Sequence, residues 1–75
     1  MAYYYINKNP QPFPESGEHE IHRGDRSCSK PPLPENRIEL GHFDNCADAA
    51  KKARQLYPDW KIDGCELCNW ECHKI

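Results

Sequence analysis

The sequence predicts one small α+β domain: an antiparallel sheet of about three strands, one packed helix and a metal-binding turn, or knuckle, near the C-terminus. Three observations support this prediction. Short aromatic and β-branched runs are separated by proline-rich segments, only one segment carries an apolar stripe with helical spacing, and three of the five cysteines lie between residues 65 and 72. A chain of 75 residues is one domain with a thin core, which usually needs disulfides or a metal.

Three segments are predicted to be strands. Residues 3–7 are aromatic and β-branched and are followed by the turn-forming pair Asn-Pro. Residues 19–23 form a second candidate, and residues 37–40 alternate polar and apolar side chains as a half-buried strand does. Proline-rich stretches at 10–17 and 26–36 cannot pair in a sheet and are predicted to be irregular connections.

The single predicted helix covers residues 46–57. Asn45 is a good N-cap and Asp48 stands three residues later, a weaker form of the capping-box acid. Pro58 ends the helix. The apolar stripe comprises Cys46, Ala49, Ala50, Ala53, Leu56 and Tyr57. Its small alanines indicate that the helix packs closely on the sheet.

The C-terminal segment from Cys65 to His73 is the densest source of metal ligands. The C-x-x-C pair of Cys65 and Cys68 allows two sulfurs to reach one tetrahedral ion from a tight turn, as structural zinc sites require. Cys72 lies four residues after Cys68 and seven after Cys65, so a short helix would place all three sulfurs on one face. His73 is an alternative ligand.

If Cys65, Cys68 and Cys72 bind the ion, the fourth ligand is predicted to come from elsewhere in the chain. Cys28 is the first choice and His22 the second, since a C-x-x-C often shares its ion with a distant upstream ligand. The predicted zinc ligands are therefore Cys28, Cys65, Cys68 and Cys72. Cys46 has two interpretations: a small buried apolar residue, or a thiol whose pKa is lowered by the helix N-terminus.

The charge balance and the number of cysteines limit which partners and which cellular compartment are expected. Ten Lys and Arg against twelve Asp and Glu give a net charge of −2 without a basic block, which argues against a nucleic-acid partner. No signal peptide or membrane span is recognisable, so we expect a cytoplasmic protein whose thiols stay reduced or bind metal. The odd number of cysteines also weakens a fully disulfide-bonded framework.

Part of this layout resembles the zinc-binding module of Ada-type alkylation-repair proteins. The resemblance runs from His22-x5-Cys28 through Asn36-Arg37, Phe43 and the alanine-rich helix to the C-x-x-C pair. In that family four cysteines bind zinc and one of them accepts a methyl group from DNA phosphotriesters. The resemblance implies zinc ligands at Cys28, Cys65 and Cys68, whereas Pro32 occupies the position of the fourth cysteine.

Over its whole length the chain is similar to a set of short, uncharacterised, cysteine-rich proteins of bacteria and phages. The shared features run from Tyr-Tyr-Ile-Asn through Glu-His-Glu-Ile-His and Leu40-Gly41-x-Phe43 to the terminal cysteine cluster. This similarity implies a self-contained family and assigns no activity.

The predicted function is a zinc-stabilised binding or regulatory module without catalytic activity, whose partner is another protein. His19-Glu20-Ile21-His22 is not the H-E-x-x-H motif of zinc proteases, and its two imidazoles would lie on opposite faces of a strand. Two alternatives remain: a nucleic-acid-contacting module of the Ada kind, and a thiol redox protein that uses Cys65 and Cys68.

Overall fold

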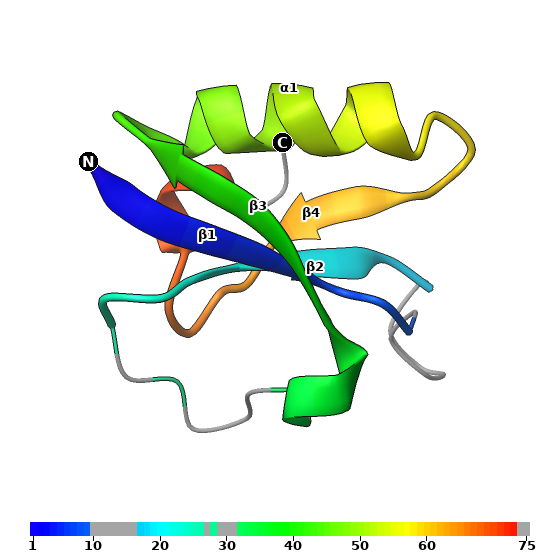
Figure 1. Cartoon of the computed structure of the whole chain (residues 1–75), viewed down its shortest axis with the longest axis horizontal. Helices are drawn as coiled ribbons and strands as arrows, with labels where there is room; N and C mark the ends of the chain where they lie inside the picture. Colours follow the sequence, from blue (N-terminus) through cyan, green and yellow to red (C-terminus); the bar gives the residue numbers. More distant parts are fainter. Residues whose placement is uncertain (10–16, 27, 29–31, 74–75) are drawn as a thin grey trace.

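The computed structural model describes residues 1–9, 17–26, 28 and 32–73. These residues form one mixed sheet, one α-helix and two short 3-10 helices (Figure 1). In chain order the elements are β1 Ala2–Asn7, β2 His19–Arg23, η1 Pro34–Asn36, β3 Arg37–Phe43, α1 Cys46–Leu56, β4 Ile62–Gly64 and η2 Trp70–Cys72.

The sheet has four strands in the order β3-β1-β2-β4. β1 lies between β2 and β3 and is antiparallel to both, whereas β4 is parallel to β2. The prediction of about three antiparallel strands was therefore wrong in its strand number and in one strand direction. With only three residues, β4 is too short to show a periodic pattern. Its ladder is continued on either side by His19 N–H donating to Lys61 O at 2.7 Å and Cys65 N–H donating to Ile21 O at 2.9 Å.

β3 continues past the predicted end at residue 40 because Gly41 forms a bulge in the strand. Tyr4 pairs with Gly41 and Tyr5 pairs with Glu39, so one residue of β3 is unmatched between them. Gly41 has φ = +113°, a backbone conformation that favours glycine. The bulge keeps Leu40 buried while the strand bends on toward Phe43.

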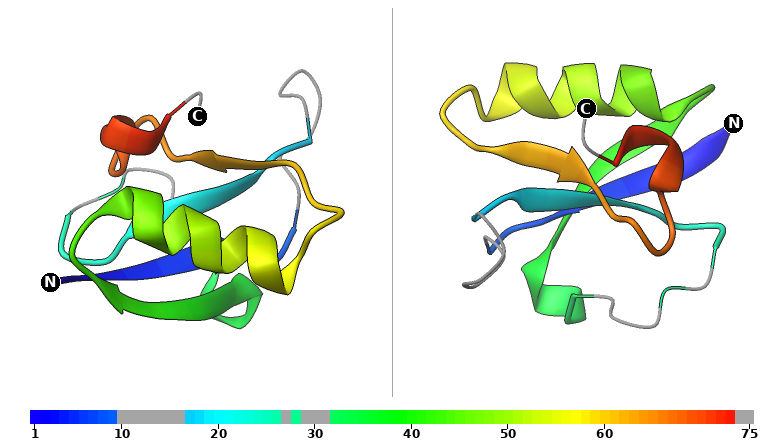
Figure 2. Two further views of the ribbon diagram at one scale, coloured as in Figure 1. Left: turned by 90° about the horizontal axis from the view of Figure 1, so that it is seen from above. Right: turned by 180° about the vertical axis from the view of Figure 1, so that it is seen from behind.

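α1 covers one face of the sheet (Figure 2). The side chain of Asn45 accepts a hydrogen bond from Asp48 N–H at 2.9 Å, which confirms the predicted N-cap. Three alanines of the helix, Ala49, Ala50 and Ala53, are fully buried, and their small side chains allow close approach to the strands. The buried core consists of Ala2, Tyr4, Ile6, Ile21, Leu40, Ala49, Ala50 and Ala53.

The other face of the sheet carries the remaining side chains of β1 and β2. Because successive residues of a strand point to opposite faces, the burial of Tyr4 and Ile21 under α1 places Tyr5 and His22 on the opposite side. The rings of Tyr5 and His22 are stacked there, 5.2 Å apart. η1 lies on this side as well (Figure 1). Among the described residues, no helix combines the length and the apolar character that a bilayer span requires.

Candidate metal centre

Four side chains from three separate segments converge on the side of the sheet away from α1. His22 comes from β2, Cys28 from the connection between β2 and η1, and Cys65 and Cys68 from the turn after β4. Their four potential ligand atoms all lie within 4.8 Å of one another. In the described part of the chain this is the one group of its kind.

Three of the six distances between these atoms are close to the edges of a tetrahedron around zinc. Zinc–sulfur bonds of about 2.3 Å and zinc–nitrogen bonds of about 2.0 Å place tetrahedral ligands about 3.8 Å apart for two sulfurs and about 3.6 Å apart for sulfur and nitrogen. Cys28 Sγ lies 3.8 Å from Cys65 Sγ. His22 Nδ1 lies 3.3 Å from Cys68 Sγ and 3.7 Å from Cys28 Sγ. The donor set therefore fits one zinc ion without a change of fold.

His22 is held so that one ring nitrogen faces the sulfurs. Its side chain is only 1% exposed and stacks on Tyr5. Nε2 has no hydrogen-bond partner among the described residues, so the polar contacts of the ring lie on the Nδ1 side. A buried imidazole with this orientation is suited to donate its Nδ1 lone pair to a metal, with the proton on Nε2.

Backbone and amide contacts fix the turn that carries Cys65 and Cys68. Cys65 O accepts from Asn69 N–H at 2.8 Å, and the buried Asn69 side chain donates to Ile21 O at 3.2 Å. Gly64 sits so close to η2 that a Cβ atom there would lie 2.6 Å from the carbonyl carbon of Cys72. Glycine is therefore required immediately before the C-x-x-C pair, and the turn is anchored to β2.

The two sulfurs of the C-x-x-C pair affect one another's protonation. A hydrogen bond from Cys68 lowers the pKa of the Cys65 thiol, and the same bond together with burial raises the pKa of Cys68. A divalent cation bound by both sulfurs would favour the thiolate form of both residues.

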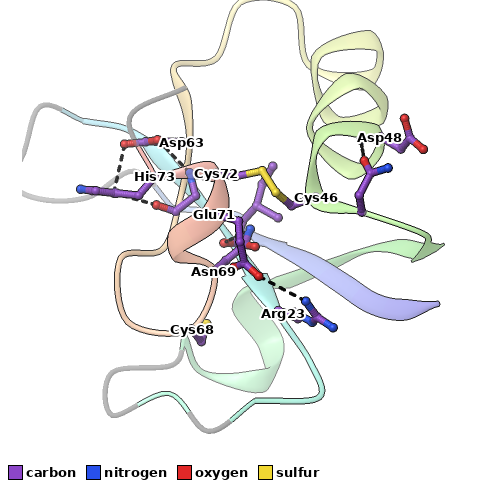
Figure 3. The surroundings of a disulfide bond; sticks show 12 residues. Arg23, Cys46, Asp48, Asp63, Cys68, Asn69, Glu71, Cys72 and His73 are labelled. Atoms are coloured by element: carbon purple, nitrogen blue, oxygen red, sulfur yellow. Dashed lines mark hydrogen bonds and ion pairs between the residues drawn. A yellow bond between two sulfur atoms is a disulfide. The ribbon is translucent and has the colours of Figure 1, made fainter.

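Cys72 departs from the predicted ligand set. Its sulfur is bonded to Cys46, with a Cα–Cα distance of 6.1 Å, and it is turned toward α1 while Cys68 lies on the opposite side of the turn (Figure 3). The prediction assumed a helix that would align Cys65, Cys68 and Cys72. The backbone instead forms a turn followed by η2, which directs Cys72 to the other side, and His22 completes the cluster in its place.

Cys46 is partly buried and packs against the apolar core, as the first of its two interpretations expects, but its sulfur is not a thiol. It is half of a disulfide that joins the start of α1 to η2. The five cysteines divide into one disulfide and three reduced residues, Cys28, Cys65 and Cys68. The odd cysteine count is accounted for because a histidine, not a fourth thiol, completes the cluster. The expectation that the thiols stay reduced or bind metal is thus wrong for Cys46 and Cys72.

His73, the other alternate ligand, lies outside the cluster. Its Nδ1 donates to Gly64 O at 3.0 Å and lies 3.5 Å from a carboxylate oxygen of Asp63, and its Nε2 is 3.6 Å from Glu66 (Figure 3). These contacts hold His73 against β4.

The knuckle surface also carries a network that the sequence did not reveal. The guanidinium of Arg26 lies 4.0 Å from the centre of the Trp70 ring and donates two hydrogen bonds of 2.7 Å to Glu71. A third, longer contact of 3.4 Å reaches Cys68 O. Arg26 therefore ties the segment before Cys28 to the turn that supplies the other sulfurs.

Fold and cluster together define a small α+β domain with a candidate Cys3His metal site. No family model, no curated protein and no solved structure matches this chain.

Proposed function

We propose that the chain is a zinc-stabilised binding or regulatory module whose ion is held by His22, Cys28, Cys65 and Cys68. The observation that carries this proposal is the convergence of four ligand atoms within 4.8 Å from segments far apart in the sequence. Three thiols and one imidazole are a donor set typical of structural zinc. Soft sulfur ligands disfavour magnesium and calcium, which take oxygen.

A structural role follows from the completeness of the ligand shell. Catalytic zinc sites use three protein ligands and keep one position for water or substrate, whereas structural sites supply all four. Here the protein offers four donors, and His22, Cys65 and Cys68 are buried. The ion would join β2, the β2–η1 connection and the knuckle turn, which compensates for the thin core of a short chain.

For the binding role, the exposed surface of the knuckle favours a protein partner. Leu67 is 43% and Trp70 is 56% exposed next to the metal cluster, and aromatic side chains are enriched where proteins associate. The net charge of −2 does not favour a phosphate backbone. We expect weak, salt-sensitive binding at most to duplex DNA, and a sub-micromolar dissociation constant at physiological salt would favour the Ada-like alternative instead.

Metal analysis of the purified full chain tests the zinc site. We expect one zinc per chain by elemental mass spectrometry, with loss of the metal in His22→Ala and Cys65→Ser. His73→Gln is the matched control, because His73 is a second histidine near the C-x-x-C pair but lies outside the cluster, and this variant should retain zinc. Protein without zinc after growth and refolding in zinc, or His22→Ala with unchanged zinc content, would refute the proposed site.

A further inference from the structure

The four proposed ligands are not equally accessible. His22, Cys65 and Cys68 are buried, whereas Cys28 is partly exposed to solvent. Oxidation of cysteine follows thiolate character and exposure. Zinc ligation keeps all three sulfurs as thiolates, so their exposure decides which one a small oxidant in solution meets first. That residue is Cys28.

A second thiol is placed to react with an oxidised Cys28. Cys65 Sγ lies 3.8 Å from Cys28 Sγ, and a disulfide requires an approach to about 2.05 Å. The two residues are 37 positions apart in sequence and belong to different segments, so their proximity is a product of the fold. The remaining sulfur of the cluster, that of Cys68, is in contact with His22 Nδ1 at 3.3 Å.

We propose that Cys28 is a peroxide-sensitive oxidation site and that Cys65 resolves it, so that a Cys28–Cys65 disulfide replaces the zinc cross-link. This inference rests on the proposed zinc site. It adds a regulatory property to that site: the domain releases zinc under oxidising conditions while the segments of Cys28 and Cys65 stay joined.

The chemistry requires a hydroperoxide as the oxidant. The Cys28 thiolate attacks one peroxide oxygen, an S–O bond forms, the O–O bond breaks, and the leaving hydroxide takes a proton to become water. The Cys65 thiolate then attacks the Cys28 sulfur, an S–S bond forms, the S–O bond breaks, and a second hydroxide leaves and is protonated. Two thiolates lose two electrons in total, hydrogen peroxide is reduced to two waters, and the ion departs because it has lost two of its four ligands.

The pairing distinguishes this mechanism from simple oxidation of the C-x-x-C pair. A Cys65–Cys68 disulfide would join two neighbours within one turn and leave the segment of Cys28 without a cross-link to the knuckle. A Cys28–Cys65 disulfide preserves the connection between remote segments. The existing Cys46–Cys72 disulfide involves neither residue and can stay intact throughout.

The test treats the zinc-loaded full chain with hydrogen peroxide in small excess. Zinc release is followed with a chromogenic zinc indicator, and the disulfides are mapped by proteolysis and tandem mass spectrometry without reduction. We expect one zinc released for each Cys28–Cys65 disulfide formed, with Cys46–Cys72 unchanged. Release that accompanies a disulfide lacking Cys28, or no release under conditions that modify an accessible model thiol, overturns the proposal.

Cys28→His is the matched variant, because an imidazole can retain zinc but cannot form the disulfide. Its zinc should leave roughly tenfold more slowly in peroxide, since the remaining thiolates are buried; release as fast as in the unsubstituted protein contradicts the proposal. If the variant does not bind zinc, disulfide mapping of the unsubstituted chain still decides the question. Absence of zinc from that chain is a failure of the proposed function, and peroxide treatment of the metal-free protein then tests the Cys28–Cys65 pairing alone.

Discussion

On the side of the sheet that faces α1, Ile6 and Ile21 are fully buried and pack with Ala49 and Ala53. On the other side, the imidazole of His22 and the thiols of three cysteines lie within 4.8 Å of one another. The first side is held by apolar contacts, which are non-directional and summed over many atoms. In the proposed zinc site, the second side would depend on four particular ligand atoms and one ion. The two sides of this small sheet would then be stabilised in different ways, and only the side with the ion should respond to chelators, protons and oxidants.

Removal of the metal should lower the stability of the domain more than any other change, and it should affect the two faces of the sheet differently. Apparent zinc binding in small finger peptides is worth roughly 10–16 kcal/mol at neutral pH, as much as the whole stability of many domains. We expect chelation under anaerobic conditions to collapse the dispersed amide NMR signals of His22, Cys28 and the turn at 65–69. Amides of α1 should keep part of their dispersion, and added zinc should restore the spectrum. An unchanged melting temperature after chelation would show that the metal side does not depend on an ion.

Truncation of a side chain in the apolar core should cause the next largest loss of stability. It should leave intact the side of the sheet that carries the His22, Cys28, Cys65 and Cys68 cluster. Ile6→Ala should lower the free energy of unfolding by about 2–5 kcal/mol, because it opens a cavity at a fully buried position. Leu56→Ala is the control: the residue is 46% exposed on α1, and its replacement should change stability by no more than about 0.5 kcal/mol. Denaturant unfolding in excess zinc measures the free energy of unfolding of both variants. Loss of zinc stoichiometry in Ile6→Ala would show that the two faces are not separable.

The disulfide between Cys46 and Cys72 connects α1 to the knuckle and should matter less than the ion. In the double variant Cys46→Ala, Cys72→Ala we expect a loss of roughly 2–4 kcal/mol, the usual range for a native disulfide. Zinc content should remain at one per chain, because neither sulfur belongs to the cluster. If the double variant loses its metal as Cys65→Ser does, Cys72 belongs to the coordination shell after all.

The ion pair between Arg26 and Glu71 should contribute least to stability, because the pair is solvent-exposed. The Arg26 guanidinium lowers the pKa of Glu71 from 4.5 to about 2. Since the folded-state pKa is depressed, the contribution to stability is complete above pH 4.5 and is lost as pH falls toward 2. Glu71→Gln should therefore lower the melting temperature slightly at neutral pH, and high salt should reduce the difference. A large, salt-independent loss would indicate that this carboxylate has another role.

The sequence predicted the apolar side better than the metal side. Asn45, the alanine stripe and Pro58 give the bounds of α1 closely, because capping and helical periodicity are local signals. β4 was missed, because three residues carry no period and its pairing with β2 is set by the tertiary fold. The third strand was predicted to end at residue 40, before Gly41, because a glycine marks an unusual backbone conformation without showing whether it is a turn or a bulge.

At the candidate metal site, the residue types predicted three of the four clustered residues, but His22, the fourth, was named only as an alternate ligand. Cys28, Cys65 and Cys68 were predicted as ligands and lie together. Cys72 was preferred over His22 because spacing was judged on an α-helix that does not form. The strand alternation contained the missing signal: once Ile21 is assigned to the core beneath α1, His22 must face the opposite side.

X-ray absorption spectroscopy at the zinc edge tests the central claim most directly, because it counts the atoms bound to the ion. For the full chain, purified without chelators, the account predicts one tightly bound zinc with three sulfur neighbours at about 2.3 Å and one nitrogen at about 2.0 Å. His22→Cys should convert this pattern to four sulfurs, which identifies the nitrogen as that of His22. A first shell of oxygen and nitrogen, or a nitrogen that persists in His22→Cys, would contradict the assignment of His22, Cys28, Cys65 and Cys68 as the metal centre.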